Sequence, residues 1–140
     1  MILIDTNIVS ETMRPRPDQG VMEWLNESET STLYVSTITI AEIEYGIEIL
    51  PSGERRLDLE RRFRHFIDEG FAQRVLHFDP DAAHTYARIM SHRRAIGRPM
   101  ASLDGQIASI AHSAGCALAT RNVTDFTDCG LEVLNPFERH

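Results

Sequence analysis

The sequence predicts an α/β fold, a three-layer α/β/α sandwich around a mostly parallel central sheet. Short apolar runs alternate along the chain with longer segments of helical periodicity, which is the pattern of strand–helix–strand units. The chain has 140 residues, a length that suits one hydrophobic core. Residues 1–140 show neither an internal repeat nor a low-complexity tract, so we expect one domain.

The first half of the sequence predicts two strands and four helices. The strands fall at residues 2–4 and 33–36, and the helices at residues 8–13, 18–25, 38–50 and 54–69. The first helix follows Asp5, Thr6 and Asn7, which are residue types that cap helices. It must end at Pro15 and Pro17, because proline has no amide hydrogen to donate inside a helix.

The second half predicts three strands and two helices. The strands fall at residues 74–78, 116–119 and 131–134, and the helices at residues 80–96 and 103–113. Asp79 and Ser102 precede the two helices as caps. Gly97 and Gly115 follow them, where a residue in the left-handed conformation commonly ends a helix.

No apolar run approaches the ~20 residues that span a bilayer, and the N-terminus lacks a basic leader, so we expect a cytoplasmic protein without a membrane partner. Cys116 and Cys129 have no metal-binding spacing and are expected to be free thiols.

The net charge of −7 argues against a nucleic-acid binder with a uniformly basic surface. All 14 basic residues are arginines, and they concentrate at residues 55–64 and 88–98. The first stretch is interleaved with acids, which favours a salt-bridged, solvated helix. In the second stretch, Arg93, Arg94 and Arg98 have fewer acids nearby and are candidates for phosphate contacts. Arg121 is a further candidate.

Four acidic residues lie where strands of the predicted sheet end or helices begin. Asp5 directly follows the first strand, and Glu42 lies in the first turns of the helix after the second strand. Asp104 begins the helix 103–113, and Asp125 follows the strand 116–119 closely. Because active groups of α/β sheets gather beyond the carboxyl ends of the strands, the four carboxylates are expected to converge on one pocket.

Each acid also has an ordinary structural explanation. Asp5 could cap the first helix, and Thr39 with Glu42 has the spacing of a capping box. Asp104 could stabilise a helix N-terminus through the macrodipole, and Asp125 could form an Asx turn. These explanations must all hold at one edge of the sheet, which favours a common functional cause. On the helix that carries Glu42, Glu44 and Glu48 form a separate row, interpreted as a solvated or partner-facing edge.

Clustered carboxylates call for a cation. Two carboxylates about 4 Å apart repel by about 4 kcal/mol at an effective dielectric near 20. Mg²⁺ or Mn²⁺ relieves this repulsion, since hard cations prefer oxygen ligands. Such an ion can polarise a phosphodiester and activate a water. The six histidines are scattered without a zinc-binding pattern.

Four blocks of the sequence resemble one known family. They are MILIDTNIVS at residues 1–10, STITIAEIEYG at 36–46, GRPMASLDGQIA at 97–108 and LATRNVTDF at 118–126. With this spacing the chain resembles PIN-domain proteins of the VapC toxin type, especially the branch related to the FitB plasmid-stability proteins. The resemblance runs nearly end to end and implies a PIN-like fold.

The resemblance also implies roles for individual residues. Asp5, Glu42 and Asp104 would bind the catalytic Mg²⁺ or Mn²⁺. The fourth acidic position falls in the last block, where Asn122 stands in place of the aspartate of many relatives. We therefore predict that Asp125 holds a second ion or a metal-bound water and that Asn122 orients it. Thr6 and Asn7 would steady the pocket, although plain helix capping explains them equally well.

The resemblance further implies an activity and partners. The expected activity is endoribonuclease cleavage of RNA leaving a 3′-hydroxyl, by the toxin of a type II toxin–antitoxin pair. The expected partners are a second copy of the chain, as a homodimer, and a small antitoxin encoded alongside, with which a larger hetero-oligomer would form. The alternative is a non-catalytic PIN-like scaffold that acts with its antitoxin in DNA binding and autoregulation. The presence of Asp5, Glu42 and Asp104 argues against a degenerate scaffold.

Overall fold

The strands pair into one five-stranded sheet of order β3-β2-β1-β4-β5. Its strands are β1 (Ile2–Ile4), β2 (Leu33–Ser36), β3 (Val75–Leu76), β4 (Ala117–Ala119) and β5 (Val133–Leu134). All four strand pairs are parallel. The computed structural model describes residues 1–138, so the last two residues of the predicted domain lie outside the described part.

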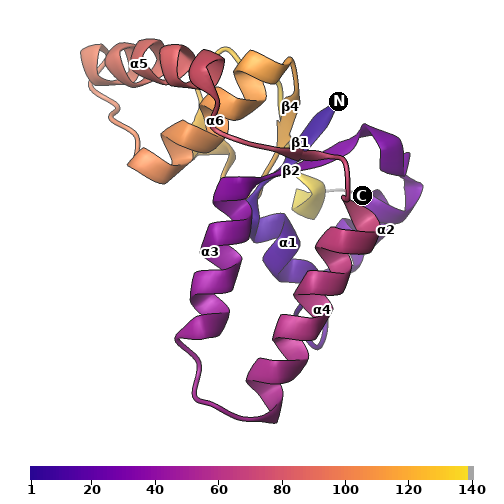
Figure 1. Cartoon of the computed structure of the whole chain (residues 1–140). Helices are drawn as coiled ribbons and strands as arrows, with labels where there is room; N and C mark the ends of the chain where they lie inside the picture. The colour runs from indigo at the N-terminus through magenta and orange to yellow at the C-terminus, as the bar shows by residue number, and fades with distance from the viewer. Residues whose placement is uncertain (139–140) are drawn as a thin grey trace.

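Helices cover both faces of the sheet (Figure 1). They are α1 (Thr6–Thr12), α2 (Gln19–Glu27), α3 (Thr37–Glu48), α4 (Glu54–Gly70), α5 (Pro80–Ala95) and α6 (Ser102–Ala114). Three short 3-10 helices also occur within residues 1–138: η1 (Thr30–Thr32), η2 (Val123–Phe126) and η3 (Pro136–Glu138). The predicted three-layer α/β/α arrangement around a parallel sheet is confirmed.

Two hydrophobic cores lie on opposite faces of the sheet. Because successive strand residues point to opposite faces, Leu3 and Leu118 pack with α5 and α6. Their neighbours Ile4 and Ala119 pack with α1, α3 and α4 on the other face. This burial on both faces explains why the strands are continuous apolar runs rather than alternating ones.

Helices α3 and α4 form an antiparallel pair that projects beyond the sheet (Figure 1). Arg56 on α4 joins the two helices through an ion pair of 2.9 Å with Glu48, and it also pairs with Glu60 one turn later at 3.1 Å. Arg62 lies 3.8 Å from Asp58. The predicted salt-bridged character of the first arginine stretch is therefore confirmed.

Most helix and strand boundaries differ from prediction by one or two residues, including α1, which begins at Thr6 rather than at residue 8. Strands β3 and β5 are shorter than the predicted 74–78 and 131–134, because each lies at an edge of the sheet and pairs on one side only. Helix α6 begins at Ser102, and Ala101 occupies the cap position without a side-chain hydrogen bond. The Ser102 hydroxyl lies instead 3.2 Å from the hydroxyl of Tyr86.

Within residues 1–138, no helix is long and apolar enough to cross a membrane. Cys116 and Cys129 are buried free thiols, as predicted.

Candidate active site

The carboxyl ends of three strands meet at a pocket of about 420 Å³. Strand register places it: Ile4 pairs with Ala119, and Leu3 pairs with Tyr34, so Asp5 lies level with Thr120 and Ser36. From β1 the chain first extends the sheet on one side, with β2 and β3, and later on the other side, with β4 and β5. In open α/β sheets, ligands bind at such a switch point, which here lies between β1 and β4. The lining residues are Asp5, Thr6, Asn7, Ser10, Glu11, Arg14, Glu42, Asp104, Arg121, Asn122 and Phe137.

Asp5 is buried at the floor of this pocket, with 5% of its surface exposed. One carboxylate oxygen accepts the amide of Thr6 at 2.8 Å, and so Asp5 does cap α1. The other accepts the hydroxyl of Thr120 at 2.8 Å. Burial, and to a smaller extent the negative charges of Asp104 and Glu42, raise the pKa of Asp5 to about 6 against the opposing effect of these hydrogen bonds. Capping and a site role therefore coexist in one carboxylate.

Glu42 does not cap its helix. Ser36 caps α3 by accepting the amide of Thr39 at 3.1 Å, which corrects the capping-box alternative. The Glu42 carboxylate instead accepts the hydroxyl of Thr6 at 2.8 Å, and the hydroxyls of Thr6 and Thr39 lie 3.0 Å apart. Since the Thr6 proton points at Glu42, Thr39 must donate to Thr6. The hydroxyls thus form a chain that aims Glu42 into the pocket.

Asp104 lies in the first turn of α6 and is only partly buried. Burial raises its pKa, and the charges of Asp125 and Glu42 raise it further, while the Arg93 guanidinium lowers it. Asp125 therefore lies within electrostatic reach of Asp104, although it is exposed and does not line the pocket.

Asn122 lines the pocket and directly precedes η2. The first turn of η2 is closed by a hydrogen bond of 3.1 Å from the backbone amide of Asp125 to the carbonyl oxygen of Asn122. One helical turn therefore joins these two residues. Which of them fills the fourth position stays a prediction.

Asn7 joins the first block to the last. Its amide group donates to the Thr120 hydroxyl at 3.2 Å and to the Asp5 carboxylate at 3.4 Å. Its carbonyl oxygen accepts the backbone amide of Arg121 at 3.1 Å. Thr6 and Asn7 thus both hold acids of the pocket in place, beyond any part in capping.

The four arginines proposed for phosphate contact have different surroundings. Arg121 lines the pocket with its guanidinium 4.7 Å from the centre of the Phe137 ring. Arg94 and Arg98 are exposed, and Arg98 pairs with Asp128 at 3.1 Å. Arg93 departs from the prediction, because the residue is buried and its Nε and Nη1 donate to backbone carbonyl oxygens rather than facing a phosphate.

Sequence reasoning missed Ser10 and Phe137, which line the pocket, and three further residues of the site. Thr120 is fully buried and holds Asp5, and Glu11 and Arg14 line the pocket, paired with each other at 3.2 Å. Thr120 could have been predicted, because it is the first polar residue after a strand, as Asp5 is. Glu11 and Arg14 had no such signal, because their approach to the pocket depends on how α1 packs.

A groove leads away from the site along α1 and α3. It has a volume of about 470 Å³ and shares Thr6, Arg14 and Glu42 with the acidic pocket. Gly46 lines it, and an added Cβ there would meet nothing within 4 Å, so the groove is open at this position. At Met13 the groove adjoins a mostly apolar pocket of about 460 Å³ between α1, α2 and α4.

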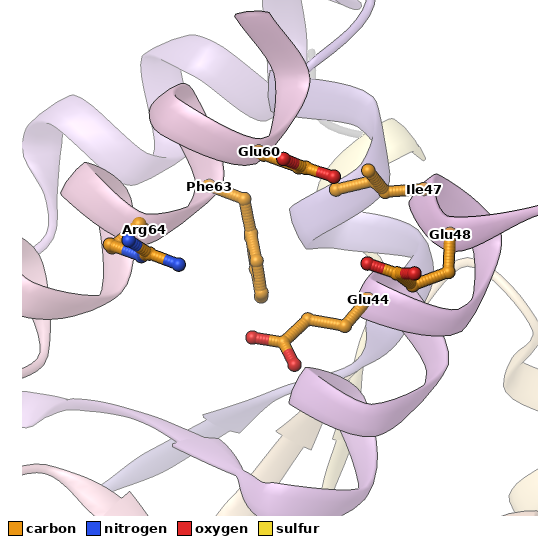
Figure 2. Close-up of a pocket in the computed structure, with 6 residues that line it drawn as sticks. All are labelled: Glu44, Ile47, Glu48, Glu60, Phe63 and Arg64. Carbon is orange, nitrogen blue, oxygen red and sulfur yellow. The ribbon is translucent and has the colours of Figure 1, made fainter. Parts of the chain in front are cut away.

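Glu44 and Glu48 lie elsewhere. Figure 2 shows them on α3 facing Glu60 and Phe63 of α4, where they line a separate, smaller pocket. They do not join the apolar surface of α1 and α2. The edge formed by Glu44 and Glu48 is therefore separate from the apolar surface of those helices.

The donor set fits a hard divalent cation. Within residues 1–138, no three His, Cys, Asp or Glu side chains are already close enough together to hold a metal ion. Mg²⁺ needs no such preformed group, because it keeps several waters and binds through one or two carboxylates. Asp5, Glu42 and Asp104 supply only oxygen ligands and line one pocket. The negative charges of Glu42 and Asp104 also raise the pKa of Asp5.

The fold and the acidic pocket define a PIN domain. The model of the family described as "PIN domain" matches residues 2–128, and the chain belongs to this family. The chain is 38% identical over 138 residues to the VapC ribonuclease Y4jK of Sinorhizobium fredii, a match covering 99% of each protein. It is 37% identical over 137 residues to Toxin FitB of Neisseria gonorrhoeae, covering 98% of this chain and 99% of that protein.

The structure is similar to solved toxin complexes. Against a chain of FitAB bound to an IR36 DNA fragment, the TM-score is 0.94 at 36% identity, covering 100% of this chain and 98% of the other. The resemblance to VapC-type and FitB-type PIN proteins inferred from four sequence blocks is thereby confirmed.

Proposed function

We propose that the protein is the endoribonuclease toxin of a type II toxin–antitoxin pair, and that it hydrolyses RNA phosphodiester bonds with a carboxylate-bound Mg²⁺ or Mn²⁺. The convergence of Asp5, Glu42 and Asp104 on one pocket carries the proposal. The names of the relatives support it, since one is a VapC ribonuclease and another a toxin.

The residues of the pocket have three different roles in this proposal. Asp5, Glu42 and Asp104 would hold the cation, which supplies Lewis-acid polarisation of the phosphodiester and a more acidic water. Thr6, Asn7 and Thr120 keep the carboxylates in place through the hydrogen bonds described above. Arg121 and Arg14 lie at the same pocket and bring positive charge to the phosphate of the bound strand.

An antitoxin segment fits the apolar pocket between α1, α2 and α4. Met13, Met22 and Leu25 line it, and the adjoining groove leads from Met13 to Glu42. An amphipathic helix docked there would place its continuation at the acids, where a basic side chain could neutralise them. The partner is thus expected to inhibit by occupying the acidic pocket.

A homodimer is also part of the proposal. Tyr45 and Ile49 on α3 are 68% and 65% exposed, and Leu57 on α4 is 56% exposed. Exposed apolar residues gathered on one projecting helix pair are typical of a protein interface.

The scaffold alternative has one observation in its favour, the solved FitAB neighbour bound to DNA. DNA binding by such a complex does not require an acidic pocket. The hydrogen-bonded placement of Asp5 and Glu42 therefore favours catalysis, with DNA binding left to the complex as a whole.

RNA cleavage by the purified protein tests the proposal. The parent should cut RNA in Mg²⁺ or Mn²⁺, stop in EDTA and recover when the metal is restored. Asp5→Asn should fold and remain inactive, because asparagine keeps the cap but lacks the charge. Cleavage that persists in EDTA, or full activity of Asp5→Asn, would refute the metal mechanism.

A further inference from the structure

Arg93 on α5 is a buried cation without an anionic partner. Its side chain is 4% exposed. Within residues 1–138 it forms no ion pair with an acidic side chain. A charge buried in this way costs several kcal/mol unless its surroundings compensate for it. The compensation here comes from oriented backbone dipoles.

Those dipoles belong to two separate segments of the chain. The Arg93 Nε donates to the carbonyl oxygen of Arg98 at 2.6 Å, in the connection between α5 and α6. Its Nη1 donates to the carbonyl oxygens of Asp125 and Thr127, both at 2.9 Å. It also lies 3.6 Å from the Cys129 sulfur. One planar guanidinium therefore ties the connection to the segment 125–129.

These two segments carry two of the acids. The connection leads directly into α6, whose first turn holds Asp104, and Arg93 binds the backbone of Asp125 itself. Two outer contacts join the same segments: Arg98 with Asp128 at 3.1 Å, and Cys129 with Met100 at 3.6 Å. Arg93 is therefore one of three side-chain contacts that join the segment before Asp104 to the segment of Asp125.

The charge of Arg93 also acts on the cluster. The guanidinium lowers the pKa of Asp104, opposing the burial and the negative neighbours that raise it. Arginine suits both tasks, because its fork of donors is rigid and its charge is permanent.

We propose that Arg93 is a positioning residue for the cation site, which fixes the turn of Asp125 against the connection that leads to Asp104 and so keeps both acids in place at the edge of the pocket. The inference rests on the proposed function in one respect, that these acids bind a divalent cation. It assigns Arg93 a role opposite to phosphate contact, since the side chain faces inward.

A purely structural clamp is the competing explanation, and the chain contains a matched control. Arg74 donates to the carbonyl oxygens of Thr30, Leu33 and Gly70, and its guanidinium lies 5.0 Å from the centre of the Phe71 ring. It precedes β3, at the amino end of the sheet, whereas the acids lie at the carboxyl ends. Arg74 therefore clamps backbone without approaching the site.

The experiment compares Arg93→Lys and Arg93→Met with Arg74→Lys and Arg74→Met in the full-length protein. Mn²⁺ binding to the free protein is followed by loss of the electron paramagnetic resonance signal of aqueous Mn²⁺, and the melting temperature is measured in EDTA. The metal concentration for half-maximal RNA cleavage and the KM for RNA are measured in parallel.

Arg93→Met should weaken Mn²⁺ binding by about tenfold to a hundredfold, the range for residues that orient metal ligands. Arg93→Lys, which keeps the charge and is the variant more certain to fold, should recover only part of this loss because one ammonium cannot bridge both segments. The metal requirement for cleavage should rise in parallel, with an unchanged KM for RNA. Both Arg74 variants should melt at lower temperature and bind Mn²⁺ like the parent.

Parent-like Mn²⁺ binding in Arg93→Lys, or an equal loss of binding in the Arg74 variants, would overturn the inference while leaving the proposed function intact. A parent protein that binds no Mn²⁺ and cuts RNA without metal would overturn both.

Discussion

Asp5 serves the fold and the site with the same two oxygen atoms. It caps α1 through the Thr6 amide and accepts the Thr120 hydroxyl, while only 5% of its surface is exposed. Burial and the neighbouring acids raise its pKa to about 6. A raised pKa means that the charged carboxylate is destabilised in the folded apo protein, and a bound cation would relieve this. The apo protein is therefore expected to be less stable than the metal-bound one.

The pKa of Asp5 predicts how stability depends on pH in EDTA. Its value in the folded state, about 6, exceeds the ordinary 3.8, so the folded protein binds the proton more tightly than the unfolded chain does. The stability that Asp5 contributes is complete below about pH 4 and is lost as the pH rises through about 6. The whole effect is roughly 3 kcal/mol.

Denaturant unfolding of the parent and Asp5→Asn in EDTA at several pH values measures this effect. Asp5→Asn should be the more stable protein at pH 7.5, and the difference should vanish near pH 4. A difference that is constant across this range would show that the Asp5 pKa is not raised.

Thr6 is predicted to set the position of Glu42. Its hydroxyl donates to the Glu42 carboxylate at 2.8 Å, and Thr6→Val keeps the shape of the side chain but removes the donor. We expect the Mn²⁺ concentration for half-maximal cleavage to rise by about tenfold. Thr6→Ser retains the hydroxyl and should behave like the parent. An active Thr6→Val protein with an unchanged metal requirement would reduce Thr6 to a packing residue.

The elements show which parts of the structure a sequence can predict. The strands could be predicted from apolar runs. Asp5 and Asp104 could be predicted from their places directly after a strand and at the start of a helix, because these are local patterns. Glu42 followed from the family resemblance as much as from its position. Its true partner, Thr6, lies 36 residues earlier in sequence, and only tertiary packing brings them together. The burial of Arg93 was missed for the same reason, since its partners lie in segments distant along the chain.

Helix η2 is the element on which the fourth ligand depends. It leaves Asp125 exposed beside Asp104 and Asn122 at the pocket. Asp125 carries a charge and Asn122 only a carbonyl dipole, so Asp125 is expected to be the stronger ligand of the two. Asp125→Asn should lower the activity less than Asp5→Asn and raise the Mn²⁺ requirement by about tenfold.

Titration of Mn²⁺-dependent cleavage for Asp125→Asn and Asn122→Ala beside the parent decides between the two residues. If Asp125→Asn matches the parent at every Mn²⁺ concentration while Asn122→Ala is inactive, Asn122 fills the fourth position.

On the scale of the whole molecule, the acidic pocket opens into a surface that a partner can follow. The groove beside α1 shares residues with both the acidic pocket and the apolar pocket between α1, α2 and α4. One bound segment could therefore gain affinity from the apolar pocket and block the acids at its end. Activity and inhibition would then depend on adjacent surfaces of the same fold.

Met22 offers a test of this arrangement. It lines the apolar pocket and is only partly buried, so Met22→Glu should fold and cut RNA like the parent. Placing a charge in an apolar docking surface should abolish co-purification with the protein encoded beside this gene. Ile96→Glu, at an exposed position on the far face of the sheet, is the control and should bind like the parent. Equal binding by both variants would place the partner elsewhere.

The central claim is that Asp5, Glu42 and Asp104 bind a divalent cation together. Anomalous diffraction from crystals of the protein soaked in Mn²⁺ tests it most directly, because the signal locates the metal without reference to activity. We predict a peak in the pocket at the carboxyl ends of β1 and β4, with carboxylate oxygens about 2 Å away. The same soak of Asp5→Asn should give a weaker peak or none. Ordered crystals with millimolar Mn²⁺ bound only at other acids, such as Glu44 and Glu48, would contradict the account.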